Sequence, residues 1–263
     1  MNSRTSRRAS PTGAPSERHE RTGPRTTRLA AALLTFALAL GVSAVPGTSL
    51  AEGNEATPAW QQIRNDEGIL VSRKEVVGSS LIAFKGEALI DAPVLLVGSV
   101  LVDTSRSKEW IDSLVESKIV RKVSDAEYVT YSHIATPIVM KDRDFVTDTR
   151  LEIDPVKRTV TIHIHSVNDP AAPSTSYVRG EIMNSSFVLT STPDGKQTRI
   201  VTEIHCDPKG SVADWIVNLF QKAWPYNTIK SLRAQVKKAD IRVHPQLKSA
   251  MDERGFFQPQ PQQ

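Results

Sequence analysis

The chain has almost no cysteine and few aromatic residues. Cys206 is the single cysteine in 263 residues, and Phe, Trp and Tyr together make up 6% of the composition. One cysteine cannot form an intramolecular disulfide, so the fold must be held together by its core. Apolar residues make up 39% of the chain, which is enough for such a core and excludes a disordered chain.

The sequence also lacks the short motifs of the common enzyme classes. It has no GxSxG elbow, no HExxH, no P-loop and no dinucleotide-binding glycine pattern. His163, His165 and His205 lie on expected strands, but no carboxylate or cysteine completes a metal-ligand spacing. Cys206 follows His205, and adjacent strand residues point to opposite faces, so the two cannot form a nucleophile–base pair. We therefore expect no metal, no cofactor and no catalytic residue.

The formal charge of +4 is confined to the N-terminal part. Seven arginines and two glutamates precede residue 52, and the remainder carries 26 basic and 27 acidic residues. That remainder has no bulk electrostatic reason to bind nucleic acid or an anionic membrane. We expect no nucleic-acid partner.

Residues 1–51 have the pattern of a basic leader with a signal peptide. A run of apolar or small residues from Leu29 to Val45 follows Arg28, and Pro46-Gly47 and the small-x-small end Ser49-Leu50-Ala51 follow the run. We expect cleavage after Ala51 and export to the periplasm or the extracellular space. The alternative is a retained membrane anchor, because the run of 17 residues approaches the ~17 to 25 that span a bilayer.

The rest of the chain predicts a linker at 52–57, one α+β domain at 58–243 and a C-terminal tail at 244–263. A short helix around Trp60 precedes a hairpin of Ile69–Val76 and Leu81–Ile90, and a helix follows at Val94–Val102. Further strands are expected at Ile119–Val123, Tyr128–Ile134, Asp144–Ile153, Thr159–Ser166, Val178–Thr190 and Thr198–Cys206.

A long amphipathic helix closes the domain. Ser211 and Asp214 form a capping-box-like start, and apolar residues then recur at helical spacing to about Val243, with a kink expected at Pro225. An antiparallel sheet that curves round one helix leaves a hollow between them. The predicted fold is a curved antiparallel sheet that grips the C-terminal helix around an internal cavity.

Alternation along the strand that begins at Arg143 separates its two faces. Phe145, Thr149 and Leu151 share the face of Arg143, and the opposite face, which includes Asp144, is expected to meet solvent. An inward guanidinium is costly without a partner. We expect either a salt bridge to a neighbouring acid or an anionic group of a ligand.

Several short motifs, in a fixed order from Trp60 to about Val236, resemble one known family. They are Trp110, Arg143-Asp144-Phe145-Val146 after Pro137 and Met140, Asp207-Pro208-Lys209-Gly210, and Trp215 with Val217 and Asn218. By these motifs the chain is identified as a member of the START (StAR-related lipid-transfer) domain family, as an exported bacterial one. The resemblance implies a helix-grip fold with a tunnel for one sterol, phospholipid or similar apolar molecule.

The resemblance also implies positions for the ligand. The final helix and a loop at 110–116 would form the roof, and Arg143 matches the position that some phospholipid-binding relatives use against the lipid phosphate. Sterol-binding relatives are similar in having a second inward arginine, which is Thr149 here. The paired acid would lie near Tyr131, Ser132 and His133, so both halves of that charge pair are missing. This favours an uncharged polar end to the cavity.

The candidate ligand-binding residues combine these positions. They are Arg143, Tyr131, His133, Phe145, Thr149, Trp110, Ile111, Leu114, Phe220 and Trp224.

The expected function is non-enzymatic binding, and transfer, of a lipid or other apolar molecule by a monomer that contacts membranes transiently. One alternative is a helix-grip cyclase or hydrolase that uses Tyr131, His133 or Arg143 on an apolar small molecule. Another is a cavity-poor interaction module whose tryptophans only fill the core. Cavity volume distinguishes carrier from module, and a titratable group of perturbed pKa inside the cavity distinguishes carrier from enzyme.

Overall fold

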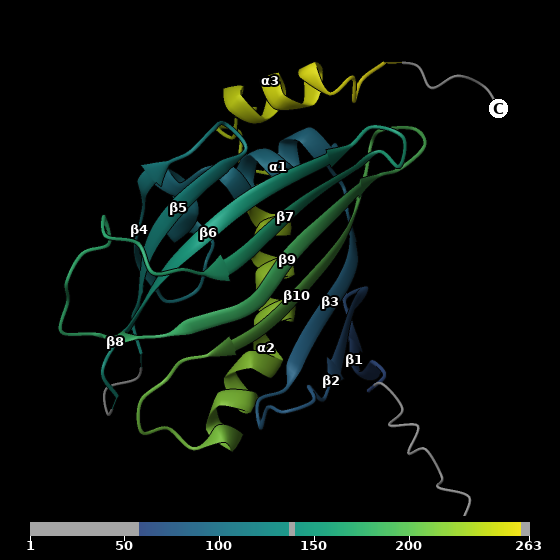
Figure 1. Cartoon of the computed structure of the whole chain (residues 1–263). Helices are drawn as coiled ribbons and strands as arrows, with labels where there is room; N and C mark the ends of the chain where they lie inside the picture. Colours follow the sequence, from purple (N-terminus) through teal and green to yellow (C-terminus); the bar gives the residue numbers. More distant parts are fainter. Residues whose placement is uncertain (1–57, 137–139, 259–263) are drawn as a thin grey trace, which may run out of the picture. The chain divides into compact units, whose positions relative to one another are not determined.

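Strands form most of the fold, and one long helix crosses them (Figure 1). The structure, a computed structural model, describes residues 58–136 and 140–258. The predicted signal peptide at 1–51 and linker at 52–57 lie outside the described residues. Within the described ranges, no helix is both long enough and apolar enough to cross a membrane.

The strands are β1 Gln61–Asp66, β2 Ile69–Lys74, β3 Ala83–Ile90, β4 Leu114–Lys122, β5 Glu127–Ile134, β6 Arg143–Asp154, β7 Thr159–Ser166, β8 Val178–Arg179, β9 Glu181–Ser191 and β10 Thr198–Asp207. The helices are α1 Val94–Val102, the 3-10 helix η1 Thr104–Glu109, α2 Asp214–Gln235 and α3 Pro245–Glu253.

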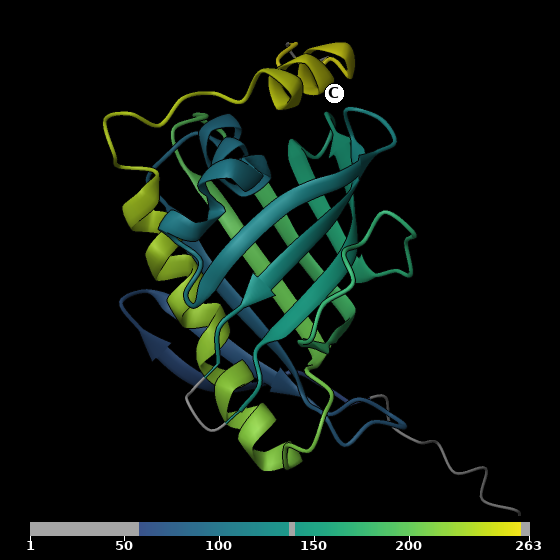
Figure 2. The same ribbon diagram turned by 90° about the vertical axis from the view of Figure 1, so that its left-hand side faces the viewer.

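The strands form one sheet in the order β1-β2-β3-β10-β9-β7-β6-β5-β4, and every neighbouring pair in this order is antiparallel. The short β8 adds a parallel bridge to β6. The sheet curves, and α2 lies along its open side (Figure 2). The predicted curved antiparallel sheet around a long C-terminal helix is therefore confirmed.

The long helix α2 touches the sheet most closely at β3. A Cβ built on Gly86 would lie 2.8 Å from the Cβ of Pro225 and 2.9 Å from Cδ1 of Ile229. Because Gly86 has no side chain, the helix backbone can approach this strand directly. α2 runs through Pro225 without interruption from Asp214 to Gln235.

Several element boundaries differ from the sequence prediction; among them, α2 ends at Gln235 rather than near Val243. Trp60 leads straight into strand β1 and not into a helix, because these residues pair with β2 at the sheet edge. β4 begins at Leu114, so the predicted roof loop is strand from that residue on. The N-cap of α2 is Ala213, which makes no side-chain cap, so Ser211 does not start the helix.

The predicted C-terminal tail contains a helix. α3 packs over α1, and its Leu247 and Met251, with Phe256 beyond it, are buried in the main core. Cδ2 of Leu247 would lie 2.8 Å from a Cβ built on Gly98 of α1. This segment therefore completes the core at that end of the sheet.

The outer face of β6 is covered, although its alternation predicted a solvent-facing side. Asp144 and Val146 are 0% and 1% exposed, beneath the connection between β7 and β8. Arg179 and Thr175 of that connection donate to the Asp144 carboxylate at 2.8 Å and 2.6 Å. Burial raises the pKa of Asp144, but these bonds outweigh it and hold the pKa below the ordinary value. Alternation separates two faces of a strand; it does not reveal what packs on them.

Candidate functional site

A cavity lies between the inner face of the sheet and α2, in two adjoining chambers. We call them the inner chamber, of about 380 Å³, and the outer chamber, of about 330 Å³. Phe145, Cys206, Phe220, Gln221 and Trp224 line both of them. A volume of this size matches the ~300 to 1,000 Å³ of sites that hold one small molecule.

One wall of the inner chamber is mostly apolar. It comes from β7, β9, β10 and α2, whose inward side chains alternate with outward polar ones. Its apolar members are Ile162, Ile164, Ile182, Phe187, Ile204, Cys206, Phe220 and Trp224.

The opposite wall, on β4, β5 and β6, is lined with hydroxyl groups, and we call it the hydroxyl wall. The strand register places Ser132 opposite Ser117, Thr130 opposite Thr147, and Tyr128 opposite Thr149. Residues directly opposite on neighbouring strands share a face, so these side chains all point into the chamber. The hydroxyl wall consists of Ser117, Tyr128, Thr130, Ser132, Thr147 and Thr149.

The described lining of the inner chamber holds few ionisable groups: Asp112, which is exposed at the rim, Tyr128 and Cys206. Burial raises the pKa of both Tyr128 and Cys206 to about 12. Both groups are therefore neutral at pH 7. The chamber offers hydrogen bonds and apolar surface, but no ionised base or nucleophile deep inside it.

Arg143 lines the outer chamber and is 5% exposed. Its guanidinium donates to the carbonyl oxygens of Pro208 at 3.3 Å and Lys209 at 3.2 Å, and to that of Lys141. Within the described residues no carboxylate pairs with it, so the expected salt bridge is replaced by backbone carbonyls. The guanidinium has more N–H donors than these three bonds use.

The Asp207–Gly210 turn shapes this carbonyl cradle. Lys209 and Gly210 both have positive φ, 53° and 78°, which turns the backbone sharply after β10. The Asp207 carboxylate accepts from the Lys209 backbone N–H at 2.8 Å and stabilises the turn. The local sequence thus aims two carbonyls at Arg143.

Most of the predicted ligand residues come together around the cavity. Arg143 lines the outer chamber, as just described. The inner chamber is lined by Trp110, Ile111, Leu114, Phe145, Thr149, Phe220 and Trp224.

Tyr131 and His133 lie on the opposite face of the sheet. Tyr131 packs with Val129 and Val146, while His133 bonds Asp142 at 2.8 Å and stacks on Tyr177 with ring centroids 4.0 Å apart. Their register partners are Val146 and Asp144, the outward residues of β6. The sequence prediction did not include three inward residues of β5, namely Tyr128, Thr130 and Ser132. Pairing of β5 with β6 identifies them.

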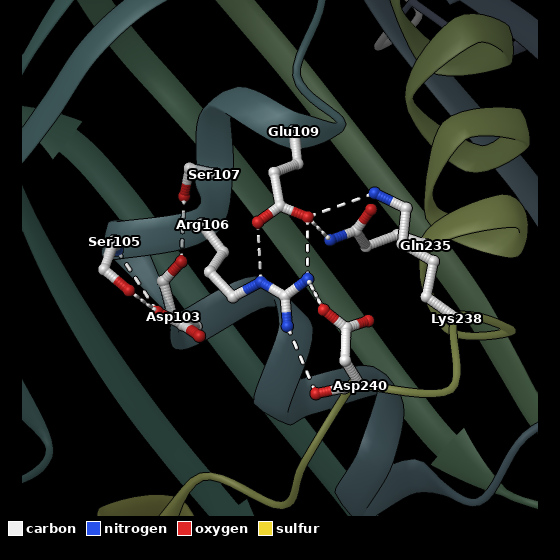
Figure 3. A network of polar contacts seen from close by, with 8 residues as sticks. All are labelled: Asp103, Ser105, Arg106, Ser107, Glu109, Gln235, Lys238 and Asp240. Atoms are coloured by element: carbon white, nitrogen blue, oxygen red, sulfur yellow. Dashed lines mark hydrogen bonds and ion pairs between the residues drawn. The ribbon is translucent and has the colours of Figure 1, made fainter.

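A polar network ties the wall of the inner chamber to the end of α2 (Figure 3). Arg106 bonds both carboxylate oxygens of Glu109, at 2.6 Å and 2.8 Å, and reaches the Asp240 carboxylate at 2.8 Å. Gln235 and Lys238 donate to Glu109 at 2.9 Å and 3.0 Å. The bond from Arg106, then those from Gln235 and Lys238, hold the pKa of Glu109 well below its usual range. The network fixes the segment that carries Trp110.

The first half of α2 exposes large apolar side chains. Trp215, Leu219 and Phe220 are 70%, 58% and 54% exposed. Phe220 also lines both chambers, so the exposed surface continues into the cavity. Exposed apolar side chains gathered in one place mark a contact surface more often than isolated ones do.

Comparison with known proteins finds one matching family and several similar proteins. The family model described as START domain matches residues 48–240. An uncharacterised protein of Pseudomonas aeruginosa is 27% identical over 201 residues, which are 76% of this chain and 95% of that protein. The phosphatidylcholine transfer protein of Mus musculus is 27% identical over 179 residues, 66% of this chain and 81% of that protein.

One solved structure is similar along nearly its whole length. It is the STAR-related lipid transfer protein (fragment 25-204) of Xanthomonas axonopodis, with a TM-score of 0.61 and 26% identity. The match covers 68% of this chain and 99% of that one.

Proposed function

The chain belongs to the START domain family, and from this we propose that it binds one lipid in the two-chambered cavity. The lipid is a phospholipid, a sterol or a similar molecule. The protein carries it without changing it chemically. The observation that carries the proposal is the cavity itself, with an apolar wall facing the hydroxyl wall around about 380 Å³. A core-filling module would have no such space. The predicted leader supports a site of action outside the cytoplasm.

The lining favours binding over catalysis. A cyclase or hydrolase needs an acid, base or nucleophile poised near pH 7. Tyr128 and Cys206, whose pKa values are raised to about 12, do not meet this need, and Asp112 is exposed at the rim. Tyr131 and His133, named in the enzyme alternative, lie on the other side of the sheet.

Arg143 supports a ligand with an anionic group. Among the described residues its charge meets carbonyl oxygens only, and the residue lines the outer chamber. A phosphate oxygen bound there would gain charge-assisted hydrogen bonds in a largely dehydrated place. The similarity to a phosphatidylcholine transfer protein supports the same class of ligand.

The exposed apolar side chains of α2 support transient contact with a membrane. Trp215, Leu219 and Phe220 would bury their apolar surface in a bilayer next to the mouth of the outer chamber. The chain after residue 51 has nearly balanced charges, so apolar burial rather than charge would drive this contact. Binding to vesicles should then depend little on salt.

The test is native mass spectrometry of the protein purified from cells that express the full chain. We expect one lipid per protein, identified after organic extraction. The variant Ile162→Trp, which fills the inner chamber, should lose the lipid, whereas His163→Trp, one residue on and facing outward, should keep it. An empty wild-type protein that also takes up no lipid from a total lipid extract would exclude the carrier function.

A further inference from the structure

Four buried side chains of the hydroxyl wall have hydroxyl groups that make no hydrogen bond within the described residues, and the Thr130 hydroxyl is itself fully buried. Tyr128 is 8% exposed, and Thr130, Thr147 and Thr149 are each 6% exposed. None of their hydroxyls makes a hydrogen bond within the described part of the chain, whereas Ser117 and Ser132 on the same wall are 3.4 Å apart and can bond each other. Buried polar groups in folded proteins are nearly always paired, so the Thr130 hydroxyl and its three unpartnered neighbours in the chamber lining need an explanation.

The four hydroxyls form one patch. Thr130 and Thr147 lie directly opposite each other on β5 and β6, and so do Tyr128 and Thr149. The second pair follows the first by two residues along each strand, on the same face. Across the chamber, Oε1 of Gln221 on α2 is also buried without a partner, while its Nε2 donates to the carbonyl of Cys206 at 2.7 Å.

The patch lies far from the charged end of the cavity. Arg143 and Thr149 are six residues apart on one strand and on the same face, which corresponds to about 20 Å at ~3.3 Å per residue. The outer chamber holds the guanidinium, and the patch holds only neutral groups. The cavity therefore has two polar ends of different chemistry, with apolar side chains between them.

We propose that the ligand carries a second polar group, uncharged, which the hydroxyls of Tyr128, Thr130, Thr147 and Thr149 bind about 13 to 20 Å from the group held by Arg143. This deepens the proposed function and rests on it. The group is a hydroxyl, carbonyl, ester or amide, because an ionised group would find no compensating charge at the patch. A lipid whose chain ends in a plain methyl group would leave the four hydroxyls unpaired and desolvated.

The test is a competition between two probes that differ only in this group. The full-length protein is incubated with equal amounts of hexadecanoic acid and 16-hydroxyhexadecanoic acid and purified again. Native mass spectrometry then measures the relative amounts of the two protein–acid complexes. The carboxylate suits Arg143, and the terminal hydroxyl reaches the patch. We expect about tenfold enrichment of the hydroxylated acid, the effect of one or two buried hydrogen bonds.

The double variant Thr147→Val/Thr149→Val keeps the shape of the wall and removes two hydroxyls. It should lose the enrichment and bind the plain acid more tightly than the wild type does, a gain that damage to the fold would not produce. Thr161→Val, on the outer face of β7, should behave as wild type.

The outcomes separate the two proposals. Equal uptake of both acids, or preference for the plain one, by the wild type would overturn this inference and leave the carrier function standing; water molecules would then satisfy the patch. A protein that takes up neither acid nor any lipid from a total extract would overturn both.

Discussion

At the scale of single residues, Arg143 shows how a buried charge is kept available. A carboxylate partner would neutralise it and leave little attraction for an anionic ligand. Three backbone carbonyls accept hydrogen bonds from its guanidinium without neutralising its charge. The residue is therefore both a support for the Asp207–Gly210 turn and a positive end for the cavity.

Replacement of Arg143 by glutamine should weaken phosphatidylcholine binding by about tenfold or more, because a hydrogen bond to a charged group is lost. The measurement is displacement of a fluorescent phosphatidylcholine from the purified protein. Arg150→Gln is the matched control, since Arg150 lies on the same strand, is exposed and faces outward. Equal losses in both variants would contradict a specific role for Arg143.

Cys206 offers a reporter of occupancy, because it is the only cysteine and lines both chambers. Burial raises the pKa of its thiol to about 12, so at pH 8 the thiol is protonated and reacts slowly. We expect slow modification by a thiol reagent, slower still with lipid bound. The urea-unfolded chain should react at the rate of an ordinary thiol, and a fast reaction of the folded, loaded protein would place Cys206 outside the cavity.

At this scale the sequence predicts which residues of one strand share a face better than it predicts how neighbouring strands pair. Counting from Arg143 places Phe145 and Thr149 inward, and both line the inner chamber. Tyr131 and His133, which the sequence predicts in the cavity, pair with the outward residues Val146 and Asp144 and so lie one position from the inward face. A shift of one residue exchanges the two faces of a strand, so pairing is needed before a face can be assigned.

At the scale of elements, the contact between α2 and β3 sets the width of the cavity. Gly86 allows Pro225 to lie against the strand, and no other side chain would fit there without moving the helix. The exposed apolar side chains of α2, Trp215, Leu219 and Phe220, precede this point, and the buried Ile229 and Leu232 follow it. The position of the helix over the chambers therefore depends on one residue without a side chain.

Gly86→Ala should destabilise the fold by about 1 to 3 kcal/mol, the usual cost of inserting a carbon into a packed contact. The variant should also bind lipid less well, because the helix must shift over the chambers. Urea unfolding followed by circular dichroism measures the first effect. Glu87→Ala, on the outer side of the same strand, should change stability by no more than ~0.5 kcal/mol. An unchanged urea-unfolding midpoint in Gly86→Ala would show that α2 can shift away from β3 without a cost in stability.

Elements with a clear period were predictable, and elements defined by their neighbours were not. The hairpin β2–β3, the helix Val94–Val102 and the strand Thr159–Ser166 follow from local patterns. β1 and the first residues of β4 are strand because they pair at a sheet edge, which no local pattern reveals. α3 is short, and its Leu247 and Met251 are core residues only because they pack on α1, which no local pattern indicates.

At the scale of the whole molecule, acid should unfold the protein through its carboxylates. The pKa values of Glu109, Asp142, Asp144 and Asp169 are all lowered in the folded state. A lowered pKa contributes stability above the ordinary values, 4.5 for Glu and 3.8 for Asp, and that stability is lost as the pH falls through the lowered values. We expect the thermal midpoint to be steady from pH 7 to about 5 and to fall below that.

The variant Glu109→Gln tests one contributor to this slope. It removes the charge that Arg106 and Lys238 share, so its midpoint should be lower at pH 7 and should fall less steeply in acid. The exposed Glu253, whose serine contact is at the surface, provides the control substitution Glu253→Gln. Parallel curves for Glu109→Gln and the wild type would show that Glu109 does not titrate with folding.

The pairing of β3 with β10 also governs how the chain can be made. Phe84 meets Ile204 and Ile90 meets Thr198, so two strands more than a hundred residues apart in the sequence must find each other. Such distant pairing closes a large loop and slows folding. A nascent chain that has emerged only as far as β9 carries the three-stranded meander β1–β3 with the β10-facing edge of β3 unpaired, and it lacks α2. Native structure therefore forms late, after nearly the whole sequence is available, and shortened fragments that end before residue 198 are expected to be aggregation-prone rather than partly functional.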